Sequence, residues 1–208
     1  MSDLEAVAQE VAACHRCELA KSRHLTVPGE GNPQADILFV GEAPGWYENQ
    51  QGRPFVGPAG QFLEELLRSV GLSRSEVFIA NVVKCRPSQN RDPLPEEIAA
   101  CGDYLARQVA AIKPQVVVTL GRFSMGRFFP PGKSIRELHG TSCRKDGMLC
   151  FAMYHPAAAL HQPALRKTIE QDMLKLPALV ATVRSENGNG EMETEKSTGG
   201  QPTQLSLF

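Results

Sequence analysis

Four short apolar runs, rich in β-branched and aromatic residues, recur along the chain, and each is followed by a glycine or a polar residue. They cover residues 37–40, 77–80, 116–120 and 149–154. Between them, apolar residues return at helical spacing over residues 60–70 and 95–112. Continuous apolar runs predict strands that are buried on both faces, and alternation with helices predicts an α/β fold. We therefore expect a three-layer α/β/α sandwich with a central four-stranded parallel sheet.

Polar residues and glycines follow the predicted strands. Gly41-Glu-Ala-Pro-Gly45 follows the first strand, Asn81 the second, Gly121 the third and His155 the fourth. In parallel sheets these carboxyl ends share one edge, and α/β proteins bind ligands there. A turn is the ordinary explanation for any single strand end of this kind. Because several ends carry such residues, we expect a binding site at this edge.

The regular apolar pattern stops after residue 184. Residues 185–203 are mostly Gly, Glu, Ser, Thr and Asn, which predicts a disordered acidic linker. Apolar residues return at the end, and we interpret residues 204–208 as a docking peptide on a tether. An accidental apolar terminus is the alternative. The predicted organisation is a folded domain over residues 1–184, followed by the linker and the peptide.

Charge is distributed unevenly along the chain. The net charge is −1, but residues 185–208 hold four glutamates against one lysine, so residues 1–184 carry an excess of two positive charges. This mild excess is compatible with a nucleic-acid partner and does not require one. No segment approaches the roughly 20 apolar residues that span a bilayer, and no secretory signal pattern opens the chain. We expect a soluble, cytoplasmic protein that acts as a monomer.

Four of the six cysteines form a candidate metal site. In a reducing compartment disulfides are rare, and paired cysteines indicate metal or redox chemistry. Cys14 and Cys17 form a Cys-x-x-Cys pair, Cys85 follows the second predicted strand, and Cys101 lies in the next helix. Four thiolates can bind structural zinc or a 4Fe-4S cluster. Cys85 and Cys101 are far apart in the sequence rather than a close pair, which favours the cluster. A structural zinc ion remains an alternative.

Several motifs occur together in one order along residues 14–172. They are Gly41-Glu-Ala-Pro-Gly45, Gly52-Arg-Pro-Phe-Val-Gly57, Asn81-Val-Val-Lys-Cys-Arg-Pro87, Asn90-Arg91 and Tyr154-His-Pro-Ala157. Linked motifs in register are more specific than any one of them. In this respect the chain resembles family 4 uracil-DNA glycosylases, the iron-sulfur branch of that superfamily. The resemblance implies a base-excision repair enzyme that flips uracil out of DNA and hydrolyses its N-glycosidic bond, leaving an abasic site.

The resemblance also implies roles for the residues of the pocket. Phe55 stacks on the flipped uracil, and Asn81 reads its edge. His155 donates a hydrogen bond to uracil O2 while negative charge develops there. Glu42 approaches the attacking water and orients or deprotonates it. Taken singly, each residue has an ordinary structural explanation, such as a core position, a turn or a helix cap. Further pocket positions are Gly41, Ala43, Glu48 and Asn90, with Glu48 helping to exclude the thymine methyl group.

Two further segments complete the resemblance. Ala159 and Leu160 resemble the wedge that enters the minor groove when a base leaves the stack, and His161 stands where relatives often carry an arginine. The last residues resemble the peptide by which bacterial repair and replication proteins bind the sliding clamp, which indicates a bacterial source. The residues of this peptide are Gln204, Leu205, Leu207 and Phe208.

Three alternatives stay open on the sequence alone. A non-catalytic iron-sulfur DNA-binding module, associated with replication proteins, would tolerate loss of His155 and Asn81, which are both present. A zinc-stabilised interaction protein would act mainly through its tail. The superfamily branch that bonds covalently to uracil carries an extra histidine-bearing loop, and residues 46–54 show no such insertion.

Overall fold

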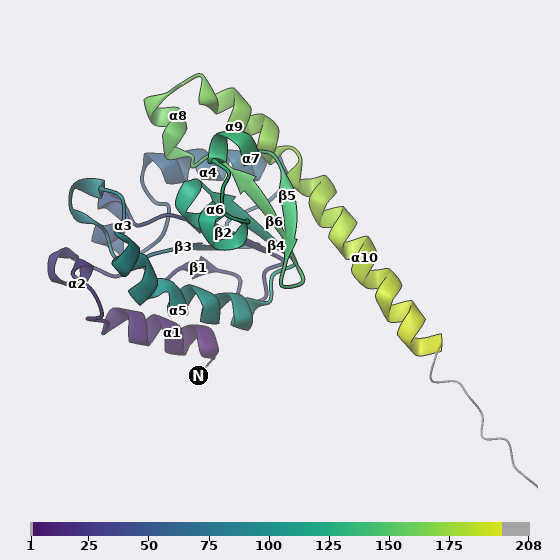
Figure 1. The fold of residues 1–208 in the computed structure, drawn as a ribbon, viewed down its shortest axis with the longest axis horizontal. Helices are drawn as coiled ribbons and strands as arrows, with labels where there is room; N and C mark the ends of the chain where they lie inside the picture. Colours follow the sequence, from purple (N-terminus) through teal and green to yellow (C-terminus); the bar gives the residue numbers. More distant parts are fainter. Residues whose placement is uncertain (1, 197–208) are drawn as a thin grey trace, which may run out of the picture.

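The computed structural model describes the backbone of residues 2–196 and the side chains of residues 2–186. Six strands form one mixed sheet with helices on both faces (Figure 1). In chain order the strands are β1 (Glu30–Gly31), β2 (Ile37–Gly41), β3 (Phe78–Asn81), β4 (Val116–Leu120), β5 (Ser142–Lys145) and β6 (Met148–Met153). Their order across the sheet is β1-β3-β2-β4-β6-β5. The central four are parallel, as predicted, and the two edge strands are antiparallel.

The sequence pattern missed both edge strands. β1 has only two residues, and β5 is polar and largely exposed, so neither shows a buried apolar run. A two-residue turn of Asp146 and Gly147, with φ of 49° and 80°, joins β5 to β6. Left-handed backbone at both turn positions is typical of a tight hairpin, for which Asp-Gly is a preferred sequence. The central sheet therefore has six strands rather than the expected four.

Helices fill most of the connections between strands. Helices α4 and α5 match the two predicted helices, and each begins with a proline, whose missing N–H costs nothing in the first turn. The helices are α1 (Asp3–Ala12), α2 (Leu19–Ser22), α3 (Trp46–Gln51), α4 (Pro58–Ser69), α5 (Pro95–Ile112), α6 (Arg122–Phe128), α7 (Ile135–Leu138), α8 (Ala157–His161), α9 (Leu165–Met173) and α10 (Leu176–Lys196), with a 3-10 turn at Ser88–Asn90.

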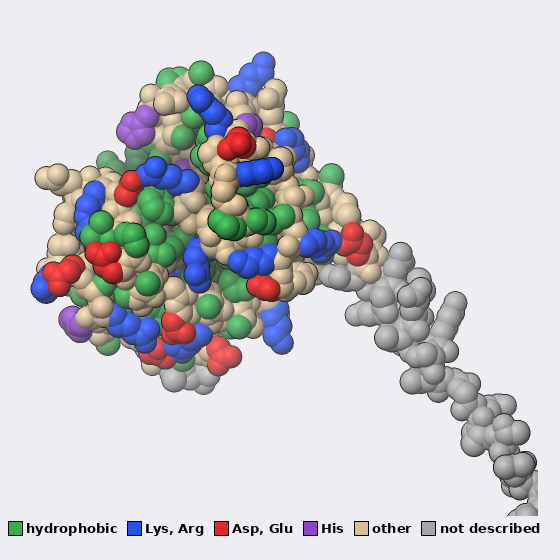
Figure 2. Space-filling view, viewed as in Figure 1, with side chains coloured by type: hydrophobic (Ala, Val, Ile, Leu, Met, Phe, Trp, Pro, Cys, Tyr) green, Lys and Arg blue, Asp and Glu red, His purple; other side chains and the backbone are tan. Residues whose placement is uncertain are grey.

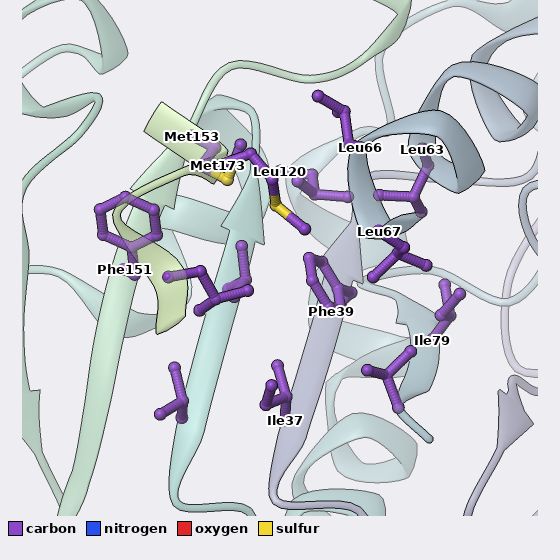
Figure 3. Close-up of a cluster of buried hydrophobic side chains, with 14 of the residues drawn as sticks. Ile37, Phe39, Leu63, Leu66, Leu67, Ile79, Leu120, Phe151, Met153 and Met173 are labelled. Carbon is purple, nitrogen blue, oxygen red and sulfur yellow. The ribbon is translucent and has the colours of Figure 1, made fainter. Parts of the chain in front are cut away.

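Two apolar clusters, one on each face of the sheet, form the core. Successive side chains along a strand point to opposite faces. Phe39 and Phe151 therefore meet α4, α9 and α10 on one face (Figure 3), whereas Leu38 and Val117 meet α5 and α6 on the other. This arrangement confirms the α/β/α layering predicted from the sequence.

Helix α1 lies against the outer side of α5 (Figure 1). Val7 and Val11 of α1 and Tyr104 of α5 form a small separate cluster, against which Cys14 and Cys101 also pack. The amino-terminal segment is thereby held beside the segment that follows β3. This packing brings the distant cysteines of the sequence into one neighbourhood.

Helix α10 continues to Lys196, so residues 185–196 of the predicted linker are helical in the structure. The domain boundary at residue 184, which lies within this helix, stays a prediction, and residues 204–208 lie outside the described residues. Within residues 2–196, no helix is both long and apolar enough to cross a membrane. On the face shown in Figure 2, acidic and basic side chains are interspersed over the folded body.

Candidate active site

A cavity of about 450 Å³ lies at the carboxyl ends of β2, β3 and β6. This is the sheet edge at which the sequence predicts a binding site. A larger groove of about 740 Å³, between α5 and the β5–β6 turn, contains none of the predicted site residues. The predicted residues that line the smaller cavity are Glu42, Ala43, Glu48, Phe55, Asn81, Asn90 and His155.

Asn81, the last residue of β3, places a buried acceptor in the cavity. Its Oδ1 has no hydrogen-bond partner among the described residues, and a buried polar atom of this kind calls for a ligand or water. Gly41 makes room for it. A Cβ at position 41 would lie 2.4 Å from Asn81 Oδ1 and 2.8 Å from the Phe55 ring. Gly41 therefore contributes to the pocket by having no side chain.

His155 follows β6 and faces the cavity as a neutral ring. Burial lowers the pKa of His155 to about 4, and the opposing charge of Glu48 offsets this only in part. The backbone N–H of Ala157 donates to His155 Nδ1 at 3.1 Å. Because Nδ1 accepts, the ring proton resides on Nε2. His155 thus offers an N–H donor without carrying a positive charge.

Phe55 is held in an unfavourable backbone conformation beside His155. Its φ is 52°, and a left-handed conformation of this kind costs about 1–3 kcal/mol in a residue other than glycine. Arg74 stabilises it, because one guanidinium nitrogen donates to the Phe55 carbonyl at 2.9 Å and another donates to the Pro54 carbonyl. The Phe55 and His155 rings lie 5.4 Å apart between centroids and 24° from parallel. Arg74 belongs to no motif, so sequence reasoning missed it.

Glu48 of α3 joins the two loops that wall the cavity. One carboxylate oxygen accepts the N–H groups of Val56 and Gly57 at 2.8 and 2.9 Å, and the other accepts that of Gly45 at 3.1 Å. The carboxylate therefore fixes the Phe55 loop against the loop that follows β2. The hydrogen bonds of Glu48 position the two loops, and its role in excluding the thymine methyl group stays a prediction.

Glu42 lies in the loop after β2, with two charged neighbours that the sequence analysis did not single out. The pKa of Glu42 is raised to about 7, mainly by burial and also by the nearby Asp92 carboxylate, while the Arg122 guanidinium opposes this rise. Asp92 and Arg122 form an ion pair with each other. A carboxyl group that titrates near neutral pH is suited to general-base chemistry.

Asn90 and the predicted wedge lie at the rim of the site. Arg86 Nε donates to Asn90 Oδ1 at 2.7 Å, which fixes the amide orientation. Of the two wedge residues, Ala159 is only 8% exposed and packs in the core, whereas Leu160 is 50% exposed. The buried methyl group of Ala159 is not available to enter DNA, which leaves Leu160 as the wedge candidate.

The four predicted cysteines line one small pocket. Cys14 and Cys17 follow α1, Cys85 follows β3, and Cys101 lies on α5. Arg23 Nη1 donates to Cys85 Sγ at 3.4 Å, and the Lys84 backbone N–H donates to Cys101 Sγ at 3.3 Å. N–H donors to sulfur and apolar walls are features of iron-sulfur sites. The apolar walls are formed by Val11, Leu19 and Tyr104.

The spacing of the cysteines fits a cluster better than a single ion. In the part of the chain that the structure describes, no three His, Cys, Asp or Glu side chains are placed to hold one metal ion. A zinc ion needs its ligands around one centre, whereas the thiolates of a 4Fe-4S cluster bind separate irons. Burial raises the pKa of Cys101 to about 11, so its thiolate requires a cation nearby. The donor set therefore fits an iron-sulfur cluster.

Lys84 links the cysteine pocket to Asn81 in the wall of the cavity. Its buried ammonium group donates to the Asn81 carbonyl at 2.8 Å and to Gln108 Oε1 at 2.6 Å, while its own backbone contacts Cys101. A shift in the cysteine segment would therefore reach Asn81 through one residue. Sequence spacing shows that Lys84 is near Cys85, but it does not reveal this burial.

Comparison with known proteins identifies the class and then the family. Residues 28–176 match the model of the uracil DNA glycosylase superfamily, so the chain belongs to this superfamily. The chain is 47% identical to the type-4 uracil-DNA glycosylase of Sulfurisphaera tokodaii over 194 residues, covering 88% of this chain and 87% of the relative. It is 45% identical to those of Saccharolobus solfataricus (85% and 86% covered) and Archaeoglobus fulgidus (86% and 94%). The chain belongs to the type-4 uracil-DNA glycosylase family, whose members carry a 4Fe-4S cluster.

Proposed function

We propose that this uracil-DNA glycosylase of base-excision repair recognises its base through Asn81. The buried Asn81 Oδ1 without a partner is the observation that carries the proposal. Uracil N3–H is a donor that satisfies this acceptor, while the Asn81 NH₂ group donates to uracil O4. Cytosine presents an acceptor at N3 and a donor at C4, so both contacts fail and a buried polar group is left unpaired.

Hydrolysis follows from the other side chains of the pocket. The flipped uracil stacks on Phe55, and Leu160 enters the gap in the duplex. As the bond from the sugar C1′ to uracil N1 breaks, its electron pair passes to the base, and His155 Nε2–H donates to the negative O2. Glu42 accepts a proton from a water whose oxygen bonds to C1′ of the oxocarbenium-like sugar. The uracil anion then takes up a proton from solvent and Glu42 releases the one it accepted, so the products are uracil and an abasic site.

The function is tested with three single-stranded oligonucleotides that differ only in one uracil, thymine or cytosine. We expect the wild-type protein to remove uracil alone, detected by alkaline cleavage at the abasic site. Asn81→Ala should lower uracil excision roughly 10- to 100-fold, the effect of losing a buried hydrogen-bonding partner. An intact uracil strand with wild-type protein would refute the function. A fully active Asn81→Ala variant would refute only the role of Asn81.

The cofactor proposal is a 4Fe-4S cluster bound by Cys14, Cys17, Cys85 and Cys101. The pocket that these residues line, and the N–H donors to Cys85 and Cys101, support it. When bound, the cluster supplies a cross-link between the amino-terminal segment and the segment after β3 rather than a chemical step. The bonds of Lys84 indicate that this cross-link braces Asn81.

Anaerobically purified protein is expected to contain iron and acid-labile sulfide in equal amounts and to absorb broadly in the visible blue. Removal of the iron should lower the melting temperature, because the segment joined by the cluster loses its anchor. A Cys85→Ala variant should lose iron, whereas the matched control Cys143→Ala should keep it, since Cys143 lies on β5 outside this pocket. Stoichiometric zinc without iron would contradict the proposal.

A second proposed interaction is with a bacterial sliding clamp through Gln204, Leu205, Leu207 and Phe208. It is supported by the return of apolar residues after a polar segment in the sequence, and the peptide lies outside the described residues. Tethering to a clamp raises the local concentration of an enzyme near newly copied DNA. This proposal also implies that the protein comes from a bacterium.

Deleting residues 204–208 is expected to abolish binding to a bacterial clamp and to leave excision from a short oligonucleotide unchanged. The physical reason is that the peptide supplies apolar anchors to the partner, whereas the residues proposed to act on uracil belong to other segments of the chain. Binding is measured by surface plasmon resonance with immobilised clamp, and replacement of residues 197–201 by alanine provides the control. An unaltered affinity after the deletion would refute the role of the peptide.

A further inference from the structure

Two adjacent aromatic residues lie exposed beside the pocket. Trp46 is 52% exposed and Tyr47 is 47% exposed. They open α3 directly after Gly45, which lines the cavity. A single exposed apolar residue is ordinary in a folded protein. Two large aromatic residues at the rim of a nucleic-acid site are what base stacking requires.

The pair packs beside the loops that wall the pocket. The Trp46 and Tyr47 rings meet edge to face, with centroids 5.0 Å apart and an interplanar angle of 89°. Tyr47 also packs on Gly57, where a Cβ would lie 2.9 Å from the ring. Gly57 lies two residues after Phe55, and its backbone N–H donates to the Glu48 carboxylate. Aromatic surface therefore extends from the Phe55 loop through Tyr47 to Trp46.

We propose that Trp46, braced by Tyr47, stacks on the base next to uracil in single-stranded DNA. When uracil leaves the strand, its neighbour loses one stacking partner and exposes a π-face to water. An indole at the mouth of the pocket replaces that partner, and it accepts any base because every base has a π-face. Trp46 directly follows Gly45, which lines the cavity that receives uracil, and this adjacency identifies the DNA strand as the occupant. This inference rests on the proposed function.

The stacking platform formed by Trp46 and Tyr47 distinguishes single-stranded from double-stranded substrates. In a duplex the neighbouring base remains paired and stacked within the helix, so Trp46 gains no new contact. In a single strand the same base is available to turn onto the indole. Trp46 therefore contributes to binding of single-stranded uracil DNA, whereas Leu160 acts where a duplex must be opened.

Fluorescence tests the contact directly, because Trp46 is the one tryptophan in the 208-residue chain. The probe is a single-stranded oligonucleotide with 2′-fluoro-deoxyuridine, in which the fluorine destabilises the cationic sugar and prevents turnover. Stacking is expected to quench the indole emission until the strand saturates the protein, and an equal duplex should quench much less. Unchanged emission at DNA concentrations that saturate binding by anisotropy would overturn the proposal.

Kinetics provide the second test. Trp46→Ala should raise KM for the single strand about tenfold, the effect of losing one base–aromatic stack, with kcat unchanged and the duplex little affected. Trp46→Phe should restore most of the loss, and Leu174→Ala, an exposed apolar residue that does not line the cavity, should have no effect. An unchanged KM would overturn the platform while uracil excision by the wild-type protein still supports the function. A Trp46-dependent dimer in sedimentation, with unchanged KM, would assign the pair to a second copy and refute the proposal.

Discussion

Replacing His155 with alanine is expected to slow single-turnover uracil excision roughly 100- to 1000-fold, the usual effect of removing one donor to a developing oxyanion. The neutral ring holds its Nε2 proton because Nδ1 accepts from Ala157, and burial lowers the pKa of His155 to about 4. Uracil departs as an anion, so the missing donor leaves its O2 charge without a partner. The binding of the uncharged base should change much less than the rate.

Single-turnover excision of a uracil strand measures this effect, with circular dichroism and the melting temperature as checks of folding. His24→Ala is the matched control, because His24 is exposed and does not line the cavity. A rate for His155→Ala within a few-fold of the wild-type rate, in a folded protein, would remove His155 from the mechanism.

Excision is also expected to fall about tenfold for each pH unit below the pKa of Glu42, reaching roughly 100-fold at pH 5. Burial raises the pKa of Glu42 to about 7. The active form is the carboxylate, so the rate rises with pH through about 7 and is level above it. Titration of His155 adds no further pH dependence to the rate above pH 5, because the ring stays neutral there.

The pH dependence is measured in single turnover between pH 5 and 9, with wild-type protein and Glu42→Gln. The variant should have a lower plateau and no acid limb, because glutamine does not titrate. Glu137→Gln is the control, since Glu137 caps the short helix α7 away from the cavity. An acid limb that persists unchanged in Glu42→Gln would assign the titration to another group.

The buried parallel strands could be predicted because their apolar runs are long and end in recognisable residues. The edge strands could not, since β1 is too short and β5 too polar to produce such a pattern. The helical signal was likewise weak in α10, where glycines and polar residues interrupt the apolar repeat beyond Val183. Local pattern therefore predicts the buried elements and misses the segments that lack a regular apolar repeat.

The residues of the site also fall into those that the sequence could predict and those that it could not. Asn81 and His155 could be predicted because each stands at a strand end within a motif, and the structure places both in the cavity. Arg74 could not, because it reaches Phe55 only through tertiary folding. Nor could the burial of Ala159, since adjacent positions on a short helix differ in exposure by how the helix packs. Motifs therefore predict which residues reach the cavity, and their roles stay predictions, whereas the contacts that hold those residues require coordinates.

The central claim is that a neutral His155 presents Nε2–H to the uracil, and nitrogen-15 NMR of the histidine rings tests it most directly. Assignment by comparison with His155→Ala isolates the signal from those of the other four histidines. Between pH 5 and 8, we predict one unchanging pair of shifts, with a protonated Nε2 and an unprotonated Nδ1. A ring that titrates near pH 6.5, or one that carries its proton on Nδ1, would contradict the account.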